Sequence, residues 1–168
     1  MSHYAIVLEI KKMLKNLDGW LDKAKSFAEA KKFDVNTLLT WRLAPDMLPL
    51  SFQIQAACDH AKFSAARTGG KDAPKHADDQ KTVDEFKTRI ASVLEFLDGF
   101  SEKDFEGIAD RTFASPRWEG KSMTAPNYLV ENAVPNFFFH TSMVYALLRH
   151  AGVEIGKRDF LGAQTFKA

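Results

Sequence analysis

The sequence predicts an all-α fold in which four long helices pack as a bundle. Apolar residues recur every three or four positions in four long stretches, which is the spacing of one face of a helix. Glycines, prolines and capping residues stand at the ends of these stretches. Helices of comparable length bury such faces only against one another, so we expect a four-helix bundle in a single domain spanning residues 1–168.

The first predicted helix spans residues 4–32, and its apolar positions are separated by lysines and aspartates. The connector that follows is marked by Trp41, Arg42 and Pro45. The second predicted helix spans residues 46–68 and ends at Gly69-Gly70, where glycine readily takes the left-handed conformation that ends a helix. Residues 71–80 mix Pro, Asp, Lys and His without periodicity, which predicts a solvated loop.

A third helix is expected from Val83, because Thr82 and Glu85 have the spacing of a capping box. Apolar residues then recur at helical spacing, and a stop is expected near Gly99. Ser101 is expected to begin one further short turn. Residues 83–98 are therefore expected to form the third long helix of the bundle.

Residues 110–123 are too short and too broken by Ser, Pro and Gly for a core helix, so a small irregular arm or hairpin is expected there. Thr124 is expected to cap the last helix, with Pro126 in its first turn. This helix should run to about His150, with a kink at Pro135. The residues after it are expected to form a tail that docks on the bundle or on a second subunit.

The composition excludes several classes of function. Lys plus Arg number 23 against 22 Asp plus Glu, and the signs are interspersed, so no basic surface for nucleic acid is indicated. No apolar run reaches the roughly 20 residues needed to cross a membrane, and no signal peptide is recognised, so we expect a cytoplasmic protein without a membrane partner. The single cysteine, Cys58, excludes an internal disulfide and is expected to be a buried thiol.

No phosphate-binding glycine loop, nucleophile elbow or His-Glu-x-x-His zinc motif is present, so the candidate chemistry rests on polar residues of the helices. Asn132, Asn136 and His140 follow one another at intervals of four, which places them along one face of the last helix. The charged residues Glu131 and Arg149 lie on a different face. The asparagine and histidine stripe is therefore expected to point into the bundle, where polar groups need partners.

The second predicted helix offers a partner, because His60 projects to the side shared with Gln53. If the two helices adjoin, His60, Asn136 and His140 meet at one interior point as three metal ligands, with a fourth position open. The alternative is a hydrogen-bonded polar core that holds no metal, because an asparagine or glutamine can satisfy a buried histidine. His76, in the predicted loop, lies outside this candidate site.

Three motifs, taken together and in this order, resemble an uncharacterised family among the DinB/YfiT-like proteins. They are TWRLAPDM at residues 40–47, PNFFFH at residues 135–140 and GKRDFLG at residues 156–162. The resemblance covers nearly the whole chain. It implies a DinB-like four-helix bundle, often a homodimer, in a superfamily that includes metal-dependent thiol transferases.

The resemblance also implies a metal site. In the superfamily, one histidine of the second helix and a His-x-x-x-His pair of the last helix hold a divalent metal, and these ligands map onto His60, Asn136 and His140. The metal would be Zn, Ni, Mn or Fe. Asn136 stands where the first histidine of the pair is expected, so this chain departs from the pattern at that ligand. A degenerate metal or ligand site is therefore expected.

Two main functions follow, and whether the chain is an enzyme stays open between them. The favoured function is the binding of a small molecule in a pocket to which Gln53, Trp41, Asn132 and Phe138 contribute. The alternative is a divalent-metal-dependent transferase or hydrolase that acts on a small thiol or electrophile. A third hypothesis is a dimeric scaffold that uses the helix faces and the tail.

Overall fold

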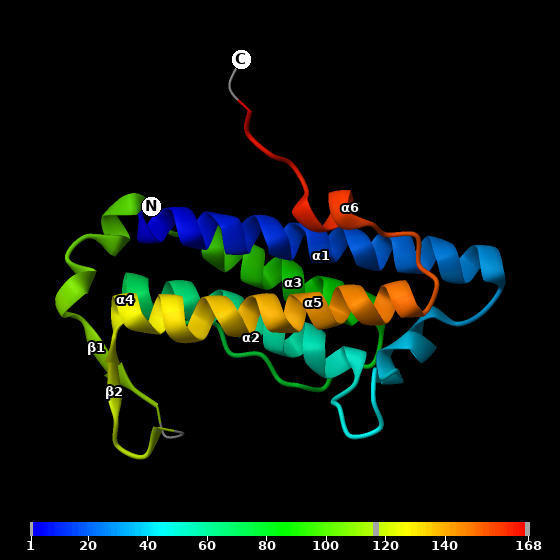
Figure 1. Ribbon diagram of the computed structural model, residues 1–168, viewed down its shortest axis with the longest axis horizontal. Coiled ribbons are helices and arrows are strands. Elements are labelled where there is room, and N and C mark those ends of the chain that lie inside the picture. The colour runs from blue at the N-terminus through cyan, green and yellow to red at the C-terminus, as the bar shows by residue number, and fades with distance from the viewer. Residues whose placement is uncertain (1, 116–117, 167–168) are drawn as a thin grey trace.

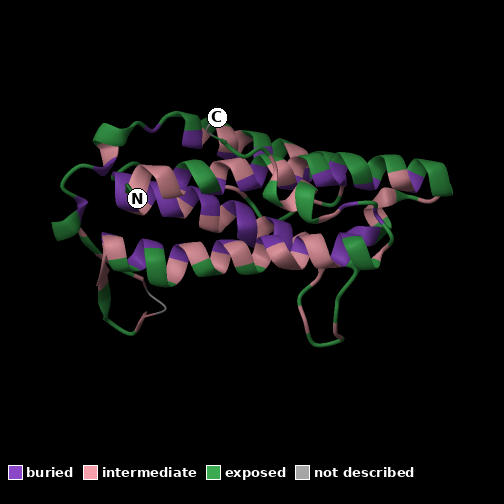
Figure 2. Ribbon diagram, turned by 45° about the horizontal axis from the view of Figure 1, so that its top comes forward, coloured by how far each residue is buried: buried purple, intermediate pink, exposed green. Residues whose placement is uncertain are grey.

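The computed structural model describes residues 2–115 and 118–166 and shows a bundle of long helices (Figure 1). These helices are α1 (His3–Lys31), α2 (Leu50–Gly69), α3 (Val83–Asp98) and α5 (Val134–His150). Helix α2 packs against α3 and α5, and α1 packs against all three. Buried residues line the facing sides of the helices (Figure 2). The predicted all-α bundle is confirmed, and none of the helices in the described residues is long and apolar enough to cross a membrane.

Helix α1 matches its prediction closely. Ser2 Oγ accepts the backbone N–H of Ala5 at 3.2 Å and so caps the first turn. Lys32, with a φ of 57°, ends the helix in the left-handed conformation. The members of the predicted apolar stripe with no exposed surface are Ile10, Leu14 and Leu17.

Helix α2 begins at Leu50 and not at the predicted residue 46. A short 3₁₀ helix, η1 (Val35–Thr40), precedes it. Proline disfavours the α conformation of the residue before it, so Pro49 delays the helix until the residue that follows. The N–H of Leu50 donates to the carbonyl of Trp41 at 2.9 Å, which closes the connector into a loop.

The interior of α2 is built from small residues. Ala57, Ala61 and Ala65 have no exposed surface, and small side chains let neighbouring helices approach closely. Cys58 is buried as predicted, and this burial raises the pKa of its thiol to about 12. Gly70, with a φ of 74°, follows the helix end at the predicted stop.

Helix α3 begins with the predicted capping box. Thr82 Oγ1 accepts the N–H of Glu85 at 3.2 Å, and Glu85 Oε2 accepts the N–H of Thr82 at 3.0 Å. The helix ends at Asp98, and the predicted short turn follows as η2 (Glu102–Phe105). Both predictions are confirmed.

The predicted arm is a two-stranded hairpin that packs on the last helix. After η3 (Ile108–Asp110), β1 (Thr112–Ala114) pairs with β2 (Ser122–Thr124) in antiparallel register. The Phe113 ring meets the buried Tyr128 ring edge to face, with centroids 4.4 Å apart. Residues 116 and 117, within the predicted arm, lie outside the described residues.

The last helix has three parts where one kinked helix was expected. The short α4 (Ala125–Asn127) leads into a π-helical segment, η5 (Tyr128–Ala133), and then into α5. Pro135 has no N–H, and in a regular α-helix its ring would clash with the carbonyl of the residue four positions earlier, Glu131. Helices kink at prolines and at π turns, and here the π turns lie directly before the proline.

The predicted tail contains a further short helix, α6 (Lys157–Leu161), which packs on α1. Trp20 Nε1 donates to the carbonyl of Asp159 at 3.1 Å, and Asn16 Nδ2 donates to the carbonyl of Phe160 at 2.9 Å. The rings of Trp20 and Phe160 are stacked with centroids 5.5 Å apart. The tail therefore docks on its own bundle.

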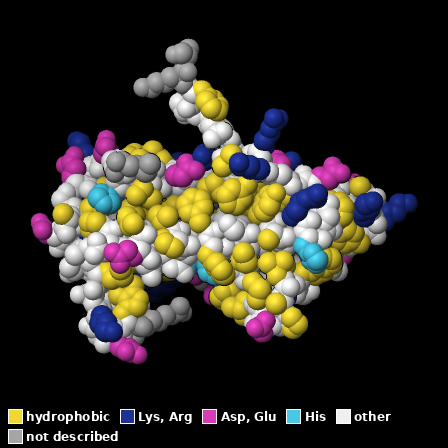
Figure 3. All heavy atoms as spheres, in the orientation of Figure 1, with side chains coloured by type: hydrophobic (Ala, Val, Ile, Leu, Met, Phe, Trp, Pro, Cys, Tyr) yellow, Lys and Arg dark blue, Asp and Glu magenta, His cyan; other side chains and the backbone are white. Residues whose placement is uncertain are grey.

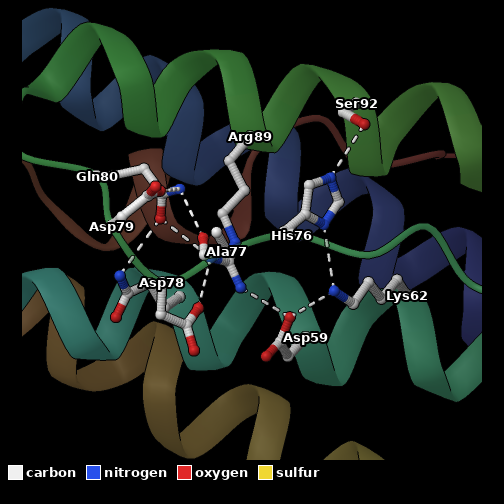
Figure 4. A network of polar contacts seen from close by, with 10 residues as sticks. Asp59, Lys62, His76, Ala77, Asp78, Asp79, Gln80, Arg89 and Ser92 are labelled. Carbon is white, nitrogen blue, oxygen red and sulfur yellow. Dashed lines mark hydrogen bonds and ion pairs between the residues drawn. The ribbon is translucent and has the colours of Figure 1, made fainter.

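Arg89 of α3 fastens the segment between α2 and α3 to the bundle (Figure 4). Its side chain is only 2% exposed, and Nη1 donates to the Ala77 carbonyl at 3.1 Å and to Asp78 Oδ1 at 2.6 Å. Nη2 donates to Asp59 Oδ1 of α2 at 2.8 Å. One buried cation therefore ties the connecting segment and two helices together.

Lys62 of α2 extends this network. Its Nζ lies 2.7 Å from Asp59 Oδ1 and 3.1 Å from His76 Nδ1. An ammonium group has no acceptor, so Nδ1 accepts, and His76 Nε2 donates to Ser92 Oγ of α3 at 3.1 Å. Residues 71–80 form the predicted loop, in which no residue is buried, and the inner side of this loop is bonded to neighbouring helices through His76.

Replacing Arg89 by Met is expected to lower the free energy of unfolding by roughly 2–4 kcal/mol, because it removes the buried partner of Asp59 and the tether of the connecting segment. Urea unfolding followed by circular dichroism measures the loss. Lys87→Met, on the same helix, is the matched control and should cost less than about 1 kcal/mol, because Lys87 pairs with Asp18 and Asp22 near the surface. Equal losses in the two variants would contradict the role given to Arg89.

The stability of the fold is expected to depend on the protonation of His76. Burial, together with the charges of Lys62 and Arg89, lowers the pKa of His76 below its usual 6.5. The unfolded chain therefore binds a proton that the folded chain rejects, so the free energy of unfolding falls as the pH drops below 6.5. Urea unfolding at neutral pH and at about pH 5 measures this fall.

His76→Gln should make this pH dependence smaller, because an amide can accept from Lys62 without titrating. His140→Gln measures the contribution of a second histidine whose pKa is lowered by burial. An unchanged pH dependence in His76→Gln would show that this imidazole does not resist protonation in the folded chain.

Candidate ligand site between two helices

Helices α2 and α5 run side by side in opposite directions, which brings His60 and His140 together (Figure 1). The two imidazole rings are stacked, with centroids 5.4 Å apart and planes inclined by 13°. Both residues are half-buried. The two histidines therefore meet at the rim of the bundle.

The rim position differs from the predicted interior position. Phe137 and Thr141 of α5 have no exposed surface, whereas Asn136 and His140, one residue earlier in each case, are half-buried. One residue corresponds to about 100° around a helix, so the polar stripe that begins at Asn132 is turned to the side of the buried face. Apolar side chains occupy the interior because their burial releases free energy without leaving a hydrogen bond unmade.

Gln53 of α2 holds His140 in place. Gln53 Oε1 lies 2.8 Å from His140 Nδ1, and Gln53 Nε2 donates to the carbonyl of Leu48 at 3.0 Å. Burial lowers the pKa of His140 below its usual 6.5, so its imidazole is neutral at pH 7. The site therefore contains an uncharged imidazole with one nitrogen bonded to a buried amide.

Asn136 is satisfied within its own helix, because its Nδ2 donates to the carbonyl of Asn132 at 2.7 Å. In residues 2–115 and 118–166, no group of three His, Cys, Asp or Glu side chains comes together to hold a metal. An asparagine amide is a weak ligand for zinc. Two histidines and one amide therefore do not fit the three-ligand set of a catalytic zinc centre.

Two exposed aromatic rings flank His140. The Phe52 ring lies 6.0 Å from the imidazole centroid at 70°, and the Phe139 ring lies 5.2 Å away at 84°. Phe52 is 38% exposed and Phe139 is 52% exposed. Figure 3 shows hydrophobic side chains gathered over the start of α2 on this side of the molecule. The histidine is therefore set in an apolar surface that is accessible to solvent.

The structure brings only part of the predicted pocket together. Gln53 contacts the site, whereas Trp41 packs against His150 at the other end of α5, with ring centroids 6.2 Å apart. Phe138 packs against the apolar core. Asn132 lies in η5, about two turns before His140. Its backbone carbonyl accepts the hydrogen bond from Asn136 Nδ2. Phe52 and Phe139 were not among the predicted pocket residues, although each is adjacent in sequence to one of them.

A hollow of about 600 Å³ lies elsewhere, between α3 and the segment that precedes it. Its walls include His76 and Arg89, together with the acidic residues Asp79 and Glu85. Both ring nitrogens of His76 and both Nη atoms of Arg89 are engaged with their own neighbours, whereas the buried Arg89 Nε has no hydrogen-bond partner among the described residues. We therefore place the candidate site at the histidine pair, where the imidazole of His140 lies among exposed aromatic rings.

The chain was compared with known families and structures. The profile of a family described as a domain of unknown function (DUF1993) matches residues 3–161. A crystal structure of a DinB family member protein from Shewanella denitrificans, at 1.83 Å resolution, is similar with a TM-score of 0.94. The two proteins share 49% identity, over 98% of this chain and 94% of that one. The comparison with curated proteins found no match. The chain therefore belongs to the DUF1993 family, and it has the DinB-like helical fold that its motifs predicted.

Proposed function

We propose that the protein binds a small molecule at the His60–His140 pair, between α2 and α5. One observation carries the proposal: the neutral imidazole of His140 is held by a buried glutamine beside two exposed phenylalanines. Ligand sites are commonly apolar, with a few well-placed polar groups that orient the ligand. The histidine pair and its aromatic neighbours have this composition.

A divalent-metal-dependent transferase or hydrolase is the second candidate. It is favoured by the bond between Gln53 and His140, because histidines that bind metals usually donate their other nitrogen to a carbonyl or carboxylate. Asn136 opposes it, because this residue offers an amide where a third imidazole is needed. Small-molecule binding without a resident metal is therefore placed first.

Replacing Asn136 by His is expected to raise the affinity for Zn²⁺ at least about tenfold, because it adds a third imidazole on the helix face of His140. Titration calorimetry of chelator-free protein with Zn²⁺ at neutral pH measures the change. Asn132→His, one turn earlier, is the matched control and should gain less, because it adds the same side chain farther from the pair. Equal gains would contradict the assignment of Asn136 to the vacant ligand position.

Elemental analysis of wild-type protein purified without chelator separates the two candidates. The small-molecule proposal expects substoichiometric metal in the wild type and the same amount in His60→Ala and His140→Ala. Near-stoichiometric metal that both variants lose would overturn the proposal and favour the metal-dependent enzyme.

A further inference from the structure

The hydrogen bonds of Gln53 decide which nitrogen of His140 carries the proton. The carbonyl of Leu48 can only accept, so the Gln53 atom that lies 3.0 Å from it is the amide nitrogen. The amide oxygen then faces His140 Nδ1 at 2.8 Å. Since this oxygen can only accept, Nδ1 carries the proton. A neutral imidazole has one N–H, so Nε2 keeps its lone pair.

Burial makes this arrangement hard to reverse. Gln53 is 3% exposed, so water cannot replace a lost partner of its amide. Turning the amide over would direct its oxygen at the oxygen of Leu48 and its N–H groups at the N–H of His140, which leaves buried polar groups unpaired. The backbone just before α2 therefore determines the tautomer of a histidine on α5.

We propose that Gln53 is a positioning residue that makes His140 Nε2 a fixed hydrogen-bond acceptor, and that the ligand is a neutral aromatic molecule that donates one hydrogen bond to it. The second part rests on the proposed function, because it takes the histidine pair as the ligand site. Phe52 and Phe139 supply exposed aromatic surface beside the imidazole.

The chemistry of the site selects among ligands. An anion gains no hydrogen bond from His140 Nε2, because this atom has no proton to donate. A ligand without a donor leaves the lone pair of Nε2 unpaired. A phenol-like molecule meets both requirements, because its ring covers apolar surface and its hydroxyl donates to the nitrogen.

The tautomer is tested by nuclear magnetic resonance of protein labelled with ¹⁵N in histidine, without any ligand. In the wild type, His140 Nδ1 should have the shift of a protonated nitrogen and Nε2 that of an unprotonated one. Gln53→Met, which has similar volume but no acceptor, should lose this preference. Gln53→Glu keeps the acceptor and adds a negative charge, so it should keep the proton on Nδ1 and raise the pKa of His140.

Gln55→Glu is the matched control, because it places the same charge two residues away on the same helix, where the side chain contacts Gln80 instead. It should leave the tautomer of His140 unchanged. A proton on Nε2 in the wild type, or an unchanged tautomer in a folded Gln53→Met, would overturn the role of Gln53. If Gln53→Met does not fold, the pKa of His140 in Gln53→Glu decides, and a value equal to that in Gln55→Glu overturns the role.

The ligand class is tested with phenol and anisole, which have similar shapes but differ in the hydroxyl donor. Shift changes of His140 on titration give the two dissociation constants, and those of His60, whose ring lies 5.4 Å away, replace them in the variant without His140. Phenol should bind the wild type roughly three- to tenfold more tightly than anisole, the ratio that one hydrogen bond supplies. This advantage should disappear in Gln53→Met and in His140→Phe.

The results with phenol and anisole distinguish two claims, the hydrogen-bond donor required of the ligand and the location of the ligand site. Equal binding of phenol and anisole at the histidine pair would overturn the donor requirement and leave the ligand site standing. Binding of neither probe at the pair would contradict the proposed site itself, whatever tautomer the first experiment finds.

Discussion

The antiparallel packing of α2 against α5 is the contact on which the other features of the molecule depend. Helices in contact lie about 8–10 Å apart, so long side chains that point along their shared rim overlap. Buried alanines such as Ala57 and Ala61 keep α2 narrow enough for neighbours on several sides. The stacking of His60 on His140 follows from this approach. Any change that separated the two helices would also separate the pair.

Helix α2 contributes side chains to two groups of polar residues. One is a network of paired charges, and the other is centred on an uncharged histidine. On one side, Asp59 and Lys62 join Arg89, and the charges of this network are paired within the chain. On the other side, Gln53 satisfies only one nitrogen of His140 and leaves the other as an acceptor. A paired network stabilises the fold, whereas an acceptor beside exposed aromatic rings can receive a ligand. The first system therefore stabilises the fold, and the second is the candidate ligand site.

Asn136 shows how a metal-type arrangement can lose a ligand without losing the fold. Its amide nitrogen donates to the carbonyl of Asn132 one turn earlier, so this N–H group finds its partner without a second helix. Three imidazoles at one point would instead need an ion or water between them. The departure that the sequence analysis noted at this position therefore has a local structural explanation.

The sequence by itself determined the long helices, the capping box at Thr82 and the hairpin arm, because these depend on local periodicity and on a few capping residues. It offered His60 and His140 as a pair only on the condition that their helices adjoin. Only the tertiary structure decided that the pair lies at the rim, that Gln53 orients His140 and that Arg89 binds the connecting segment. The reason is physical. Periodicity defines the faces of each helix separately, whereas burial and hydrogen bonding depend on which residue of another element occupies the facing position.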